Sequence, residues 1–264
     1  MPDVLFDTDG PLCLITLNRP AKRNAVHGPM ARALRDAFQR FEADDALRVA
    51  ILWGAGGHFC AGADLGAVGD PALRNELDPR GGGGGPMGPT RLALSKPLIA
   101  AVNGYAVAGG LELALMADLR VADDDATFGV FCRRWGVPLI DGGTVRLPRI
   151  VGMGRALDMI LTGRAVDAAE ALTMGLVNRV TPRRGALAAA IGIARQITEF
   201  PQQCLLVDRA SAYAQGDLPL ADALRQEGMR GTPIVAAEGV AGAARFAAGA
   251  GRHGCFEETA GLSA

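Results

Sequence analysis

The spacing of apolar residues over positions 1–53 predicts two strands, a helix and a third strand. Residues 12–17 (LCLITL) form a short apolar run, and residues 49–53 (VAILW) form a β-rich run that ends at a cluster of glycines. Between these runs, large apolar side chains recur at intervals of four and three: Met30, Leu34, Phe38 and Phe41. That interval places them on one face of a helix that packs on a core.

Strand and helix patterns continue to alternate along the chain. Short apolar runs predict strands at residues 97–102, 119–122 and 177–180. Helical stretches are expected from about Gly109, over residues 152–163 and over residues 167–174. Asp167 is a suitable N-cap for the last of these helices. Strands that alternate with helices are typical of the α/β class.

Two further segments define the domain organisation. From residue 185 onward the chain is almost wholly helix-forming, which predicts a core over residues 1–200 and a helical C-terminal region over residues 201–264. Residues 69–90 break the periodicity with five consecutive glycines, residues 81–85, among several prolines. No GKS or GKT follows these glycines, so they are not a P-loop, and they predict a mobile surface loop or a lid.

Composition and charge exclude several classes of protein. The chain has 264 residues, of which 49% are hydrophobic, and this is too apolar for a disordered chain. A net charge of −1, with Lys22 and Lys96 as its lysines, disfavours nucleic-acid and anionic membrane partners. Residues 123–125 (DDD) are expected to form a solvated turn. No apolar run is long enough to span a membrane and the acidic N-terminus is unlike a signal peptide, so we expect a cytoplasmic protein.

The cysteines indicate neither a disulfide framework nor a metal site. They are five in number and scattered: Cys13, Cys60, Cys132, Cys204 and Cys255. No CxxC or CxxH spacing occurs, so zinc has no ligand pattern and buried, reduced thiols are expected.

Two glycine-rich turns carry the candidate chemistry. Residues 57–65 (GHFCAGADL) and residues 103–114 (NGYAVAGGLELA) each follow a predicted strand and precede a probable helix. Small residues there leave backbone N–H groups uncovered, and two such amides directed at one point form an oxyanion hole. The alternative is that the small residues only allow helix and strand to pack closely.

The order of short motifs resembles the crotonase (enoyl-CoA hydratase/isomerase) superfamily. Besides the two turns, the matching segments are residues 18–25 (NRPAKRNA), 95–104 (SKPLIAAVNG), 117–120 (ADLR), 128–129 (FG), 142–148 (GGTVRLP), 161–164 (LTGR) and 171–177 (ALTMGLV). Together they extend, in the family's order, from about residue 12 to residue 180. The resemblance implies an α/β spiral of repeated ββα turns, a helical C-terminal trimerisation region, and a homotrimer or dimer of trimers.

The resemblance also implies an acyl-CoA thioester as substrate, with no further cofactor and no metal. By position, the backbone N–H groups of Ala63 and Gly109 would form the oxyanion hole. Coenzyme A or substrate contacts fall on Ala25, Ala61, Gly62, Ala63, Asp64, Leu65, Gly110 and Cys132. For Asp64, a helix N-cap is the alternative. His253, with Arg245 and Arg252, is a further candidate for contact with the CoA phosphates.

Glu112 lies three residues after Gly109, where hydratases of this family carry a glutamate that activates water. Addition across a Cα–Cβ double bond needs a group that positions water and a group that delivers a proton. The resemblance therefore implies a catalytic role for Glu112. The alternative is a carboxylate that only complements the helix dipole.

Two positions depart from the hydratase pattern or extend it. Cys132 stands where hydratases carry a second glutamate, and a thiol is a poor acid or base near pH 7. Asp141 lies at, or one residue from, an aspartate used by some isomerases and a dehalogenase of the superfamily. It is a candidate second catalytic carboxylate, with the N-cap of the following helix as the alternative.

Three functions follow from these residues. The first is a lyase or isomerase that acts on an enoyl-CoA through an oxyanion-stabilised enolate. The second is an isomerase that moves one proton with a single carboxylate, which tolerates Cys132. The third is a non-catalytic acyl-CoA-binding member of the superfamily, suggested by the missing second glutamate.

Overall fold

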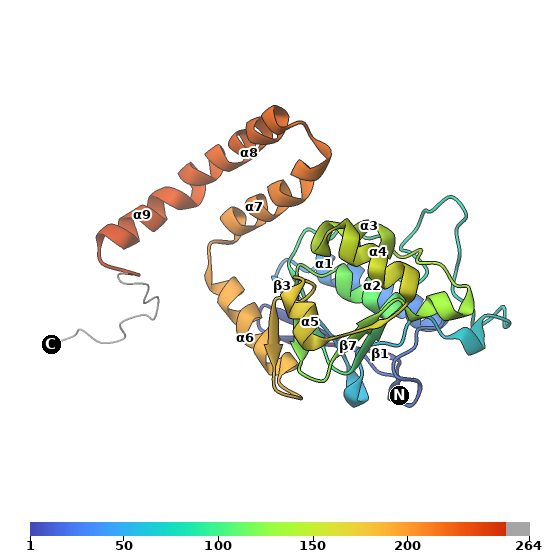
Figure 1. Cartoon of the computed structure of the whole chain (residues 1–264). Helices are drawn as coiled ribbons and strands as arrows, with labels where there is room; N and C mark the ends of the chain where they lie inside the picture. The colour runs from blue at the N-terminus through green and yellow to red at the C-terminus, as the bar shows by residue number, and fades with distance from the viewer. Residues whose placement is uncertain (252–264) are drawn as a thin grey trace. The chain divides into compact units, whose positions relative to one another are not determined.

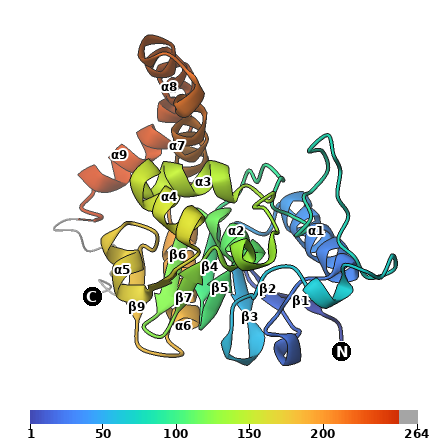
Figure 2. The ribbon, with the colours of Figure 1, turned by 45° about the vertical axis from the view of Figure 1, so that its right-hand side comes forward.

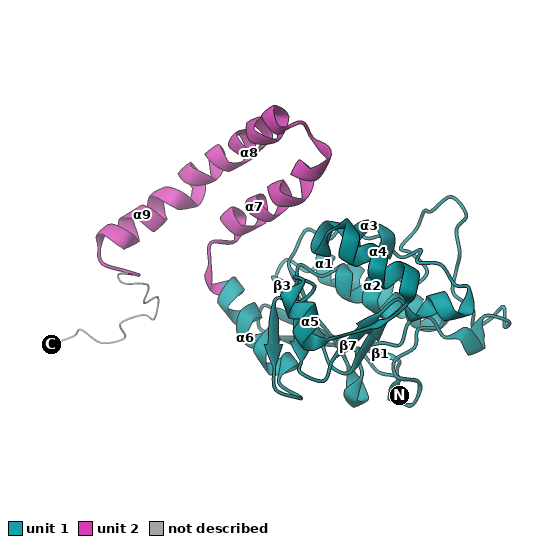
Figure 3. Ribbon diagram, in the orientation of Figure 1, with its two compact units in different colours: residues 1–198 teal, residues 199–264 magenta. Residues whose placement is uncertain are grey.

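The fold is described from a computed structural model, in which residues 1–251 are described. The chain divides into two compact units, residues 1–198 and residues 199–264 (Figure 3). Of the residues suggested to contact the CoA phosphates, Arg252 and His253 fall outside the described residues, and Arg245 lies on the helix Val240–Ala247.

The first unit is built on a six-stranded sheet. Its order is β1 (Val4–Asp9), β2 (Leu12–Leu17), β3 (Val49–Gly54), β4 (Leu98–Val102), β6 (Leu119–Asp123) and β9 (Arg179–Thr181) (Figure 2). β1 and β2 form an antiparallel pair, and the other neighbours are parallel. The sequence predicted the last of these strands at residues 177–180. It begins two residues later, at Arg179, because residues 177 and 178 belong to the connection that follows the preceding helix.

A smaller sheet gives the fold its repeated turns. It contains β5 (Tyr105–Val107), β7 (Thr127–Gly129) and β8 (Ala165–Asp167). Twice a strand of the large sheet is followed by a strand of the small sheet and then by a helix: β4 leads to β5 and α2 (Gly109–Leu115), and β6 leads to β7 and a short helix at Phe131–Trp135. These successions are of the ββα kind that the family resemblance implies.

Helices cover both faces of the large sheet. The remaining helices of the first unit are α1 (Gly28–Ala43), α3 (Gly143–Val151), α4 (Met153–Thr162), α5 (Ala168–Thr173) and α6 (Ala186–Glu199) (Figure 1). In β3, Val49 and Ile51 pack in a cluster with residues of α6, whereas Ala50 and Leu52 pack in a larger cluster with residues of α1 and α2. The alternation follows from the two-residue period of a strand.

Two expectations about loops are correct only in part. The glycine-rich loop lies on the surface only in part, since residues 86–90 are all buried. In the expected solvated turn at residues 123–125, Asp124 and Asp125 are exposed turn residues. Asp123 is not, because it is 1% exposed and its carboxylate accepts hydrogen bonds from Arg184 N and Ala186 N at 2.9 and 2.8 Å. It thereby satisfies amides at the start of α6, where the helix leaves N–H groups unpaired.

The second unit consists of helices. They are α7 (Gln202–Ala214), α8 (Leu220–Ile234) and α9 (Val240–Ala247), with a π-helical turn at Val235–Gly239 between the last two. None of these three helices has a buried residue. Over residues 1–251, no helix combines the length and the apolar character that crossing a membrane requires.

Candidate active site

The first glycine-rich turn lies beyond the carboxyl end of β3. It is tied to the N-terminal segment by a parallel bridge, in which Val26 N donates to Gly62 O at 2.8 Å and Asp64 N donates to Val26 O at 2.9 Å. Such a bridge uses the residues on either side of Ala63 and leaves the Ala63 N–H outside it. Gly62 has φ +98°, a conformation that glycine adopts without strain.

The second turn joins β5 to α2. Gly109 is the first residue of this helix, so its N–H has no acceptor one turn earlier. Ala108 before it has φ 53° and ψ −125°, which is a strained conformation for a residue with a side chain. Strain of this kind costs on the order of 1–3 kcal/mol and is concentrated at functional sites.

The two turns approach each other closely. Cys60 N donates to Tyr105 O at 2.8 Å, and Val107 N donates to Cys60 O at 3.1 Å. A Cβ atom on Gly62 would lie 3.1 Å from Gly109 N, and one on Gly110 would lie 2.1 Å from Cys60 O. Glycine at these positions therefore allows the backbones that carry the Ala63 and Gly109 amides to pack side by side.

Both turns border a cavity of about 800 Å³. The predicted site residues that line it are Ala61, Ala63, Leu65, Gly109, Glu112, Cys132 and Asp141. Those that do not line it are Ala25, Gly62, Asp64 and Gly110. Its other walls are mainly apolar and include Leu77, Met87, Phe131, Trp135, Val137 and Ile140. Among residues 1–251, no three His, Cys, Asp or Glu side chains are grouped so as to hold a metal ion.

Asp64 has the capping contact that the alternative predicts. Its carboxylate accepts a hydrogen bond from Gly66 N at 3.1 Å at the start of the short helix Leu65–Ala67. It also pairs with Arg19, whose Nη2 lies 3.1 Å from Asp64 Oδ2. Through this pair, the segment after Ala63 is connected to the loop that follows β2.

Glu112 is a buried carboxylate that lines the cavity. It is 2% exposed, and its Oε1 accepts hydrogen bonds from Asp141 N and Gly143 N, both at 2.8 Å. Burial and the negative charge of Asp141 raise the pKa of Glu112 from 4.5 to about 7. The hydrogen bonds from the two amides act in the opposite direction and lower it. Glu112 is therefore present in both protonation states near neutral pH.

Asp141 is not the N-cap of α3, so that alternative is wrong. The N-cap is Gly142, with φ 97° and no side-chain capping bond, and the amide of Gly143 donates to Glu112 instead. The Asp141 carboxylate turns to the glycine-rich loop, where Oδ1 accepts hydrogen bonds from Met87 N at 2.9 Å and from the Thr90 hydroxyl. Burial raises the pKa of Asp141, and the Thr90 and Met87 donors oppose that shift.

Cys132 shares the cavity with Glu112. It is 8% exposed and lies in the short helix Phe131–Trp135. Burial raises the pKa of its thiol, and the negative charge of Glu112 raises it further. The thiol is therefore protonated at neutral pH, and a protonated thiol is neither a nucleophile nor a useful base.

Comparison with known proteins decides the family. A family model for enoyl-CoA hydratase/isomerase matches residues 7–246. The chain belongs to the enoyl-CoA hydratase/isomerase family. It is 41% identical to enoyl-CoA hydratase EchA19 of Mycobacterium tuberculosis over 204 residues, and these residues make up 75% of each chain. It is 44% identical to a carnitinyl-CoA dehydratase of Salmonella arizonae over 193 residues, which are 72% of each of these two chains.

A solved structure confirms the crotonase fold predicted from the motifs. Enoyl-CoA hydratase EchA1 from Mycobacterium marinum superposes with a TM-score of 0.87 at 36% identity. The superposition covers 94% of this chain and 96% of that one.

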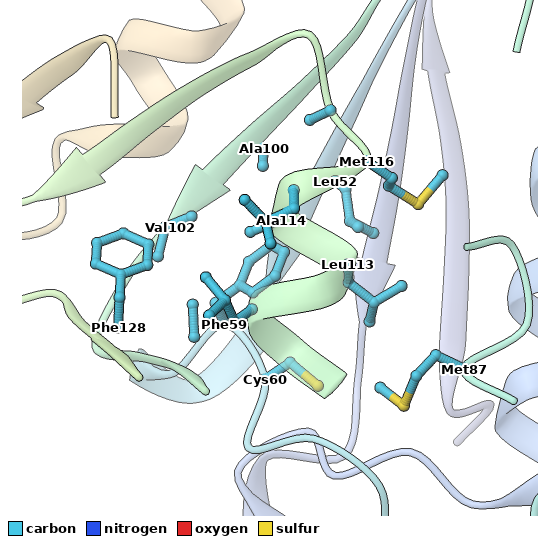
Figure 4. Close-up of a cluster of buried hydrophobic side chains, with 14 of the residues drawn as sticks. Leu52, Phe59, Cys60, Met87, Ala100, Val102, Leu113, Ala114, Met116 and Phe128 are labelled. Carbon is cyan, nitrogen blue, oxygen red and sulfur yellow. The ribbon is translucent and has the colours of Figure 1, made fainter. Parts of the chain in front are cut away.

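Sequence reasoning missed several cavity residues of this enoyl-CoA hydratase/isomerase family member. Met87 is 1% exposed and lines the cavity, although it lies in the loop that was expected on the surface. Figure 4 shows Met87 and Cys60 among the buried side chains around α2, which carries Leu113 and Ala114. The signal available in the sequence was an apolar Met87 within a run of glycines and prolines.

The raised pKa of Glu112 predicts how the stability of this family member depends on pH. A carboxyl group whose pKa is about 7 when folded and 4.5 when unfolded favours folding below pH 4.5, and this contribution is lost as pH rises to 7. We expect the free energy of unfolding of Glu112→Gln to rise, relative to the unmodified protein, by about 2 kcal/mol between pH 5 and pH 8. Urea unfolding of both proteins at the two pH values measures this change. A difference in unfolding free energy that does not vary with pH would contradict the assigned pKa.

Proposed function

We propose that the protein is an enoyl-CoA hydratase, which adds water reversibly across the Cα–Cβ double bond of an enoyl-CoA thioester. The observation that carries the proposal is that Ala63 and Gly109 line the same cavity as the buried Glu112. The relatives named as hydratase and dehydratase support a reaction of this class.

The two amides would act on the thioester carbonyl. When water attacks Cβ, negative charge moves to the carbonyl oxygen and an enolate forms. The Ala63 and Gly109 N–H groups would donate hydrogen bonds to that oxygen, and each such donor typically contributes about 10²–10³ in rate. The dipole of α2, which begins at Gly109, adds positive potential at the same point.

The coenzyme A part of the substrate is assigned to the first turn and its surroundings. We place it against the backbone of residues 61–65, with Ala25 and Gly110 behind them. Ala61, Ala63 and Leu65 line the cavity, whereas Gly62, Asp64, Ala25 and Gly110 would act by shaping that backbone. The reaction as proposed consumes only the thioester and water, so no additional cofactor takes part.

Glu112 would carry out both proton transfers. Its carboxylate takes a proton from water as the oxygen–Cβ bond forms, and the resulting carboxylic acid gives a proton to Cα of the enolate. The net result is addition of one water molecule, with Glu112 returned to its starting state. A pKa of about 7 suits both steps, because acid and base are then similar in strength near neutral pH.

Cys132 favours one alternative to hydration. We assign Cys132 to the position of the second glutamate of hydratases, so a protonated thiol would stand where a carboxylate helps to hold water. An isomerase needs only one carboxylate, which removes a proton from one carbon of an enoyl-CoA and returns it two carbons away. Glu112 alone would be sufficient for that reaction.

One experiment separates the possible functions. Purified protein is incubated with crotonyl-CoA, longer 2-enoyl-CoAs and 3-enoyl-CoAs in D₂O, and the products are analysed by mass spectrometry and NMR. The expected result is a 3-hydroxyacyl-CoA with deuterium at Cα. Double-bond migration without hydration would support the isomerase instead. Binding by calorimetry with no turnover across the panel would support a non-catalytic acyl-CoA-binding protein.

We also propose that the protein assembles into homotrimers or a dimer of trimers. Helices α7, α8 and α9 have no buried residue. Their exposed large apolar side chains are Tyr213, Leu220, Leu224, Met229, Val240 and Phe246. Exposed apolar area of this extent supports contacts with other chains. A single-chain mass in light scattering would contradict the assembly.

A further inference from the structure

The buried part of the glycine-rich loop is attached to the segment before α3 by one carboxylate oxygen. Asp141 Oδ1 accepts hydrogen bonds from Met87 N at 2.9 Å and from the Thr90 hydroxyl. All three groups are buried, with Asp141 3%, Met87 1% and Thr90 1% exposed. Asp141 lies 54 residues after Met87, so the contact holds together two distant parts of the chain.

The surrounding contacts strengthen this attachment. The Arg146 guanidinium donates to Thr90 O at 2.6 Å and to Asp141 O at 3.1 Å, which bridges the two main chains. Gly85 has φ +95°, and a Cβ there would lie 2.3 Å from Thr90 Oγ1 and 2.9 Å from Asp141 Oδ1. The loop therefore closes tightly around the carboxylate.

The attached loop places Met87 against the proposed oxyanion site. A Cβ atom on Gly109 would lie 2.7 Å from the Met87 sulfur and 3.0 Å from its Cγ and Cε. Met87 therefore packs directly on Gly109, and both residues line the cavity. The position of the 85–90 loop thus defines the cavity wall beside the Gly109 amide.

We propose that Asp141 is a positioning residue, which holds the 85–90 loop so that Met87 forms the wall of the acyl site beside Gly109. It acts through hydrogen bonds and not as a second acid or base. Its Oδ1 already accepts two hydrogen bonds, which Asn would also accept. The inference rests on the proposed function, because it assigns the wall of the same acyl site.

Two matched pairs of variants test the role of Asp141. Asp141→Ala removes both hydrogen bonds, and Thr90→Val removes the one that the Thr90 hydroxyl donates. Asp141→Asn and Thr90→Ser retain an acceptor and a hydroxyl. We expect the first two variants to raise KM for enoyl-CoA about tenfold, with kcat changed less than about threefold. The second two should stay within about threefold of the unmodified protein in both constants.

A catalytic Asp141 would give a different pattern. In Asp141→Asn, kcat would then fall as far as in Asp141→Ala, by about 10²–10⁴. In both Thr90 variants, kcat would stay near that of the unmodified protein. That pattern would overturn the proposal. Four variants that all match the unmodified protein would overturn it too.

Hydrogen exchange gives a readout that does not depend on turnover. The Met87 amide should exchange at least about tenfold faster in Asp141→Ala and Thr90→Val than in the unmodified protein, and at a near-normal rate in Asp141→Asn and Thr90→Ser. If no enoyl-CoA is turned over, the proposed function fails while this pattern still tests the attachment. Equal exchange in all the proteins would overturn the positioning role.

Discussion

Glu112→Gln should lower kcat for hydration of an enoyl-CoA by about 10²–10⁴ while the fold is retained. The fold should survive because the Gln Oε1 can accept the same hydrogen bonds from Asp141 N and Gly143 N. Activity should be lost because an amide neither takes a proton from water nor returns one to Cα. Steady-state kinetics with crotonyl-CoA measures the effect.

A control replaces a glutamate far along the chain. Glu199 lies exposed at the end of α6, so Glu199→Gln makes the same chemical change without altering the cavity. It should leave kcat unchanged within about twofold, as surface substitutions generally do. If Glu112→Gln kept the activity of this control, the acid/base role of Glu112 would be wrong.

Gly62→Ala should lower kcat/KM by about 10²–10³, the effect of losing one oxyanion donor. The added Cβ would lie 2.9 Å from the Cβ of Ala108 and 3.1 Å from Gly109 N. The two turns must then separate, and the Ala63 and Gly109 amides can no longer be directed at one oxygen. Binding of a substrate analogue, measured by calorimetry, should weaken less than turnover falls.

Gly57 provides a matched control for backbone strain. It is the first residue of the same turn and also has a positive φ, +90°, but a Cβ there would meet nothing within 4 Å. Gly57→Ala therefore adds similar strain without pushing the turns apart. Equal losses of activity in Gly57→Ala and Gly62→Ala would show that strain, and not the approach of the turns, causes the effect.

Local patterns predicted most of the fold. The four apolar residues that predicted the first helix, Met30, Leu34, Phe38 and Phe41, are all fully buried on α1. Asp167 caps α5 as expected, accepting a hydrogen bond from Glu170 N. These predictions succeed because periodicity and capping depend on residues within one or two turns of each other.

Features set by distant residues could not be predicted in this way. The glycines and prolines of the 85–90 loop are typical of a surface loop, and their burial depends on Asp141, more than fifty residues later. Asp141 has the position of an N-cap, yet Glu112 from another helix accepts the α3 amide. In both cases a long-range hydrogen bond overrides the local preference of the sequence.

Within residues 1–251, the hydrogen bonds of the Glu112 carboxylate all go to one oxygen, and this has a stereochemical consequence. Oε1 accepts hydrogen bonds from Asp141 N and Gly143 N, so the proton that Glu112 takes up belongs on Oε2. A single oxygen would then remove the proton from water and return one to Cα, on the face of the double bond toward it. Hydration in D₂O should therefore give one diastereomer, with the hydroxyl group and deuterium added to the same face.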